Sequence, residues 1–253
     1  MSGTVSALVM AGFGLIAGVG VTAVGPGGVL VTVGLFLASG LSPAAVAGTG
    51  IVTHLATGGL GSVAYHRSGQ LRHPGTRRIA LILAITAAAG TPVGVFVNSV
   101  ASGQLFGILL AVFLVVVAAL VWLRSPQDGA EDTHPHHRPA LLIGLGLGVA
   151  VIGGMFGVGG PLLSVPLLVL AGTPVLSALG AAQVQSVIVA IVGTLSYLSR
   201  GTIDWRLALV VGGPELFGAL IGWKLAQAVP PRILRRAMIV ALVTSAGLIG
   251  IHG

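Results

Sequence analysis

The sequence predicts an all-α integral membrane protein built from two inverted repeats, each with four long helices and one short, glycine-broken half-helix. The first observation behind this prediction is the absence of charge over long stretches. No Asp, Glu, Lys or Arg precedes Arg67, and none occurs from Pro139 to Ser199. The second is composition: 7% of the 253 residues are charged and mean hydropathy is +1.07, whereas soluble domains carry about 25% charge. Only a lipid-facing exterior tolerates this composition.

The third observation is an internal repeat of glycines. One constant shift pairs Gly28 with Gly160 and Tyr65 with Tyr197. A polar, proline-containing stretch that holds three of the five acids separates the two halves, and it is typical of a solvated linker. The chain is therefore predicted to be one membrane domain, 1–253, with a first repeat at 1–123, a linker at 124–139 and a second repeat at 140–253.

The apolar stretches of the two halves predict the same order of helices in each. Long apolar stretches lie at 4–24, 44–64, 78–98 and 104–123 in the first half, and at 140–156, 175–198, 206–226 and 232–252 in the second. A short apolar piece follows each glycine cluster, at 29–39 and 161–171. At about 1.5 Å per helical residue, such a piece crosses only about half of a 30 Å bilayer core. These pieces are predicted to be half-helices or parts of broken helices.

The basic residues predict the orientation of the chain. If each short piece completes a crossing, only Arg200 and Arg206 of the 12 Lys and Arg residues lie on the far face. If the short pieces do not change side, eight basic residues lie on one face. The other four, Lys224, Arg232, Arg235 and Arg236, then lie on the opposite face. The positive-inside rule favours the first arrangement, with inverted repeats and both termini outside the cytoplasm. We expect a multi-pass protein of the plasma (inner) membrane.

Composition and motifs argue against several other classes of protein. The net charge of +7 is explained by topology signals, and no aromatic-rich basic patch suggests nucleic-acid binding. Absence of cysteine excludes disulfides and thiolate metal sites. No zinc-protease, serine-hydrolase or nucleotide-binding motif is present, so we expect neither an enzyme nor a cofactor, and no metal site.

The two glycine clusters are the main candidates for a binding site. They contain Gly25, Gly27 and Gly28 in the first half and Gly157, Gly159 and Gly160 in the second. Backbone amides at the start of a half-helix, aided by the helix dipole, can bind an anion, and inverted repeats would bring both clusters together near the midplane. The alternative is that the clusters form tight turns or close helix crossings.

Polar residues of the following helices are further candidates for substrate binding. They are Thr49, Thr53 and His54 in the first half and Gln183, Gln185 and Ser186 in the second. Amide and hydroxyl groups in a dry environment need several partners and suit the oxygens of an oxyanion. A threonine in a membrane helix can equally bond its own backbone.

Glu215 is the one acid within an apolar span, and His54 is predicted at similar depth. An ionisable group at membrane depth is a candidate functional residue. We expect Glu215 and His54 to carry protons during transport; the alternative is a structural or gating role for Glu215 and plain packing or substrate binding for His54.

The glycine-rich segments GPGGVLVTVGLFLASGLSPAAVAGTG and GVGGPLLSVPLLVLAGTPVLSALGAA resemble the TauE/SafE family of sulfite and organosulfonate transporters. The likeness covers nearly the whole chain. It departs from the family pattern at Gly34, where the second half has Pro166, and at Ala181, where the first half has Thr49. The resemblance implies movement of a small sulfur-containing or carboxylate anion, such as sulfite, sulfoacetate or a similar sulfonate, without ATP hydrolysis by this chain.

These observations together predict a secondary transporter that moves its small anion across the lipid bilayer by alternating access. A passive anion channel of the same fold is the alternative. The sequence leaves open whether the chain works as a monomer or as a homodimer.

Overall fold

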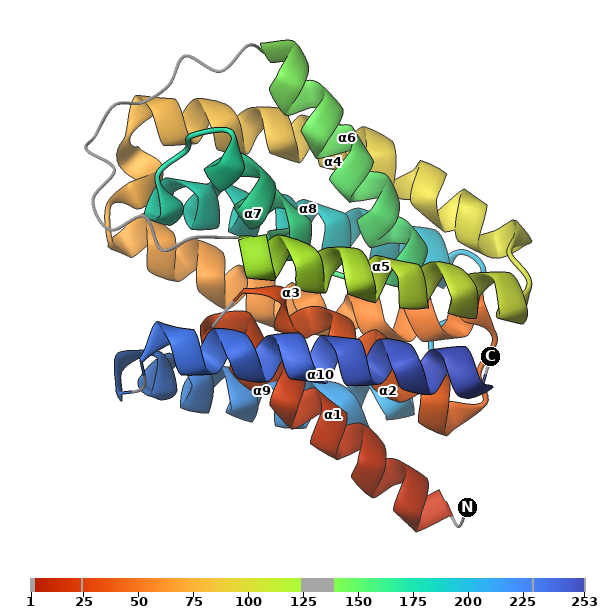
Figure 1. Cartoon of the computed structure of the whole chain (residues 1–253). Helices are drawn as coiled ribbons and strands as arrows, with labels where there is room; N and C mark the ends of the chain where they lie inside the picture. The colour runs from red at the N-terminus through yellow and green to blue at the C-terminus, as the bar shows by residue number, and fades with distance from the viewer. Residues whose placement is uncertain (1–2, 24, 124–138, 229, 253) are drawn as a thin grey trace.

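The computed structural model describes residues 3–23, 25–123, 139–228 and 230–252. Within these ranges the chain forms helices joined by short turns, and no strand is present (Figure 1). Six helices of the described part are long and apolar enough to cross a membrane. The protein is therefore a multi-pass membrane protein, as predicted.

The first half contains four long helices and one short one, as expected. Its elements are α1 (Gly3–Ala23), η1 (Pro26–Gly28), α2 (Val29–Ser39), α3 (Pro43–Arg67), η2 (Gln70–Arg72), α4 (Pro74–Val100) and α5 (Gly103–Leu123). Helix α4 begins before the predicted residue 78, because Pro74 suits the first turn of a helix and the following arginines are exposed there.

The second half repeats this order. Its elements are α6 (Pro139–Phe156), α7 (Pro161–Leu170), α8 (Val175–Leu198), α9 (Trp205–Ala228) and α10 (Pro231–His252). The Asp204 carboxylate accepts a hydrogen bond from the Leu207 amide at 3.0 Å and so caps the start of α9. All of the predicted linker except Pro139 lies outside the described residues, and its assignment stays a prediction.

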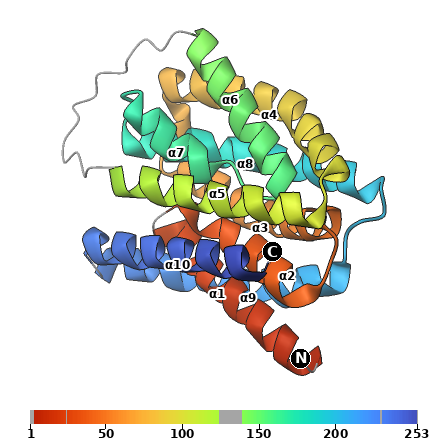
Figure 2. The ribbon, with the colours of Figure 1, turned by 45° about the vertical axis from the view of Figure 1, so that its right-hand side comes forward.

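The main helix pairs each join one helix from each half. Helix α1 packs along α9, α4 along α6, α3 against α8, and α5 against α10. If the two halves are equivalent, α1 corresponds to α6 and α9 corresponds to α4. The α1–α9 and α4–α6 pairs are then the same contact made twice, which is the pattern of two repeats related by a twofold axis. Helices α5 and α10 lie side by side and run in opposite directions (Figure 1, Figure 2). Inversion of the entire repeat stays a prediction.

Glycines allow the α1–α9 and α4–α6 pairs to approach closely. A β-carbon at Gly18 would overlap the backbone oxygen of Glu215, and one at Gly94 would overlap that of Val151. Membrane helices pack through such small residues because lipid supplies no hydrophobic force between them.

The carboxyl end of α6 is held by three helices. Thr32 of α2 donates to the Phe156 oxygen at 3.0 Å, Asn98 of α4 to the Met155 oxygen at 2.6 Å, and Tyr197 of α8 to the Gly154 oxygen at 2.8 Å. An open helix end inside a membrane needs such partners, because lipid cannot accept or donate hydrogen bonds. Phe156 also stacks on Phe113 of α5 in the largest apolar core.

Candidate functional site

The two glycine clusters border one pocket. Gly25 and Gly28 of the first half and Gly159 of the second lie in its wall. Gly25 adopts φ 107° just before η1, and Gly157 adopts φ 69° before α7. Positive φ favours glycine at both turns. Each turn reverses the chain so that a half-helix starts at the pocket.

The polar wall of the pocket comes from α3 and α8. His54 and Thr57 lie one helical turn apart on α3, and Gln183 and Ser186 lie one turn apart on α8. All four side chains are buried. The pocket therefore offers an imidazole, an amide and two hydroxyls, and its wall includes residues at the start of both half-helices. The other lining residues are Val21, Val29, Gly58, Pro161 and Leu162.

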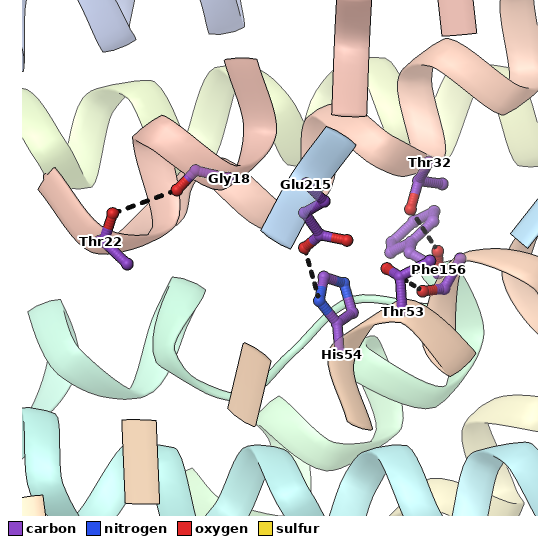
Figure 3. Close-up of polar contacts among 8 residues, drawn as sticks. Gly18, Thr22, Thr32, Thr53, His54, Phe156 and Glu215 are labelled. Carbon is purple, nitrogen blue, oxygen red and sulfur yellow. Dashed lines mark hydrogen bonds and ion pairs between the residues drawn. The ribbon is translucent and has the colours of Figure 1, made fainter. Parts of the chain in front are cut away.

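His54 connects the pocket to α9. Its Nδ1 lies 3.5 Å from Oε1 of Glu215, and the two side chains are 3% and 0% exposed (Figure 3). Among the described residues, the His54 Nε2 and both Glu215 oxygens have no hydrogen-bond partner. A buried carboxyl in this position is neutralised either by the imidazolium or by a proton of its own.

The glycines at the pocket leave room for these polar groups. A β-carbon on Gly28 would lie 2.7 Å from Cε1 of His54, and one on Gly159 would lie 2.7 Å from Oγ of Ser186. Both distances are shorter than van der Waals contact. A side chain at either position would displace a polar group of the wall.

Six of the residues predicted for substrate binding line the pocket: Gly25, Gly28, His54, Gly159, Gln183 and Ser186. The other three glycines lie at close packing contacts. Gly27 packs on the α1 backbone, Gly157 on Ala47 of α3, and Gly160 on α8. Here the alternative of turns and close helix crossings describes what the structure shows.

The remaining predicted residues make bonds away from the pocket. Thr49 accepts a hydrogen bond from the Asp204 amide at 3.0 Å, and Thr53 donates to the Gly50 oxygen of its own helix at 2.9 Å. Gln185 accepts a hydrogen bond from Ser164 and donates to the Gly146 oxygen at 3.2 Å, which ties α8 to α7 and α6.

Sequence reasoning missed Thr57. It lies three residues after His54 and so shares its helix face. This spacing could have identified Thr57 from the sequence. Among the described residues, no group of three His, Cys, Asp or Glu side chains is placed to hold a metal ion. His134, His136 and His137 lie outside the described residues.

Comparison with known proteins agrees with this picture. The profile of the family described as sulfite exporter TauE/SafE matches residues 10–249, which confirms the predicted resemblance. The chain is 26% identical to the probable membrane transporter protein ORF9 of Sinorhizobium sp over 87% of this chain and 83% of the relative. It is 22% identical to the probable membrane transporter protein YunE of Bacillus subtilis over 94% and 95%. No solved structure gives a significant match.

Proposed function

The chain belongs to the sulfite exporter TauE/SafE family, and we propose that it is a secondary transporter for a small sulfur-containing oxyanion, organosulfonate or carboxylate. Its relatives carry the name of probable membrane transporters, which supports transport across a membrane without chemical conversion of the solute. The single observation that carries the proposal is the pocket shared by the two glycine clusters, whose polar side chains are buried.

The chemistry of the pocket supports an oxyanion as the solute. Thr57 and Ser186 can donate hydroxyl hydrogens, Gln183 can donate two amide hydrogens, and His54 can donate from Nε2. Two half-helices begin at the pocket, so their dipoles favour negative charge there. These groups would replace the water that the anion loses when it enters the membrane.

The position of the pocket supports alternating access. Its wall combines η1 and α3 of the first half with the start of α7 and α8 of the second. Rocking of one half against the other would therefore open the same site to either side of the membrane in turn. Glu215 and His54 couple this movement to protons, since both are buried and lie next to each other.

We place the protein in the inner membrane with both termini outside the cytoplasm. This orientation puts most of the basic residues on the cytoplasmic side, as the positive-inside rule requires. Protease protection of a terminal tag in intact inverted vesicles, where an outward terminus is shielded, tests it independently of transport.

Flux into liposomes containing the purified full chain tests the function. Sulfite, methanesulfonate and acetate serve as test anions, each with and without a pH gradient across the membrane. A proton-coupled transporter accumulates at least one of them above its external concentration. Equilibration without accumulation would identify the alternative, a passive channel, and no flux of any of the three would refute anion transport.

A matched pair of variants ties the flux to the pocket. His54→Gln removes the imidazole from the pocket, and we expect it to abolish accumulation. Ser196→Ala removes a hydroxyl of α8 that bonds only the Val192 oxygen of its own helix and does not line the pocket, so its flux should match that of the unchanged protein.

A further inference from the structure

The charges around the pocket limit what it can bind. Among the described residues that line it there is no Lys, Arg, Asp or Glu, and His54 is the one group that can become positive. Among the described acids, the one paired with His54 is Glu215, at 3.5 Å. We infer that the site binds a single monoanion together with one proton, and that it excludes dianions. This inference rests on the proposed function.

None of the other titratable groups on the described surrounding helices lines the pocket. Helices α1, α2, α6 and α7 contain no Asp, Glu, Lys, Arg or His. On α9, Arg206 and Lys224 lie nine residues to either side of Glu215, about 13 Å along the axis. The remaining groups on these elements and at their ends are Tyr65, His66 and Arg67 of α3, Arg72 of η2, His73, Arg77 and Arg78 at the start of α4, Tyr197 of α8, Arg200 after it, and Asp204, which caps α9.

The empty site is neutral when His54 and Glu215 share one proton. In that state the pair is either imidazolium with carboxylate or imidazole with carboxylic acid, and neither form leaves net charge in the membrane interior. Loss of the shared proton would leave an isolated carboxylate, and gain of a second would leave an isolated imidazolium. Both are costly at membrane depth, so the empty site holds one proton.

The occupied site is neutral only after one more proton arrives. A monoanion brings one negative charge, and the pair balances it when His54 is imidazolium and Glu215 is carboxylic acid. The second proton comes from water and goes to Glu215, while the imidazolium charge is left to face the anion. Anion and proton therefore enter together, and the loaded site crosses the membrane without net charge.

The geometry of His54 suits a role in which its imidazolium faces the anion while Glu215 takes the second proton. Its Nδ1 is turned to Glu215, whereas Cε1 and Nε2 lie 2.7 and 3.4 Å from the point that a β-carbon on Gly28 would occupy, at the pocket wall (Figure 3). Nε2 is buried and has no hydrogen-bond partner in the part of the chain that the structure describes. An anion oxygen in the pocket would supply the missing acceptor and hold a charge-assisted hydrogen bond.

A dianion cannot be balanced by this site. Both titratable groups are already fully protonated with the first negative charge, so the second would remain uncompensated at membrane depth. The inference therefore excludes solutes such as sulfate or sulfoacetate and selects monovalent sulfonates and hydrogen sulfite.

Methanesulfonate and sulfate test the inference on the full-length wild-type protein in detergent. Both are tetrahedral at sulfur and similar in size, but they differ by one charge, and methanesulfonate stays ionised between about pH 6 and pH 8, so a proton bound with it must go to the protein. We expect about one proton taken up from a weakly buffered solution per methanesulfonate bound, and at least about tenfold weaker binding of sulfate.

Two variants separate charge from hydrogen bonding. His54→Gln removes the only group that can turn positive, so methanesulfonate binding and proton uptake should both disappear. Ser186→Ala removes an uncharged donor from the same pocket, so binding should weaken while the ratio of about one proton per anion is kept.

The outcomes are distinct from those of the flux assay. Proton uptake well below one per anion, sulfate bound as tightly as methanesulfonate, or failure of methanesulfonate to bind while sulfite is transported would overturn the inference and leave the proposed transporter intact. If none of the test anions is transported, the proposed function itself fails. The wild-type measurements decide the matter even if His54→Gln does not fold.

Discussion

Nδ1 of His54 on α3 lies 3.5 Å from Oε1 of Glu215 on α9, so a buried histidine and a buried acid form one pair across the two halves. Only the imidazole borders the pocket. A movement of α9 relative to α3 would therefore change the partner of His54 without touching the solute, which links helix motion to the charge at the site.

Glu215→Gln should reduce pH-gradient-driven accumulation of the transported anion about tenfold or more, because the variant lacks the carboxyl that accepts the second proton. The glutamine side chain has nearly the same size and can still bond Nδ1 of His54, so the fold should persist. Accumulation in liposomes with an imposed pH gradient measures the effect. Unchanged accumulation would assign Glu215 a purely structural role.

Gly28→Ala should weaken anion binding. Its methyl group would lie 2.7 Å from Cε1 of His54 and would push the imidazole out of position. Gly59→Ala on α3 is the matched control, since a β-carbon there meets nothing within 4 Å. The anion-induced rise in melting temperature should shrink in the first variant and stay in the second. Equal behaviour of the two variants would contradict the placement of the site.

Gln185→Ala should lower the free energy of unfolding by about 1–3 kcal/mol, because Ser164 and the Gly146 oxygen both lose a buried partner. The effect should be on stability and not on the proton count per anion, since Gln185 does not line the pocket. Thermal unfolding in detergent measures it, with Ser196→Ala as a control. A loss of anion binding at full stability would place Gln185 in the site instead.

Gly94→Ala should destabilise the α4–α6 contact, because its methyl group would overlap the backbone oxygen of Val151 and force the helices apart. Gly144→Ala on α6 should have little effect, since its β-carbon meets nothing within 4 Å. A cost of about 1–3 kcal/mol in the first variant and less than about 0.5 in the second is expected from unfolding curves. Equal stabilities would show that the two helices can separate at no cost.

Most of the fold could be predicted because lipid imposes long apolar helices and glycine clusters interrupt them. The predicted ranges 29–39 and 175–198 coincide with α2 and α8. The start of α4 was missed because arginines were placed before the helix, although exposed arginines can occupy its first turns. Burial of α3 among its neighbours explains how a span with several polar residues is tolerated.

The site was harder to predict because a helix presents neighbouring residues in different directions. Gln183 and Gln185 are two residues apart and so point to nearly opposite sides, and only Gln183 reaches the pocket. His54 and Thr57 share a face, whereas Thr53 bonds its own helix. Which face of α3 or α8 turns to the pocket depends on the packing of helices from the other half, which one span of sequence does not contain.

The three side chains at the carboxyl end of α6 restrict how the molecule can move. Thr32, Asn98 and Tyr197 come from both halves and cover three successive carbonyls, each of which would cost several kcal/mol if left bare in lipid. These three hydrogen bonds have to persist throughout the proposed transport cycle. In the proposed transport cycle, the movement that exposes the solute would therefore be a pivot about this fixed contact, and not a separation of the two halves.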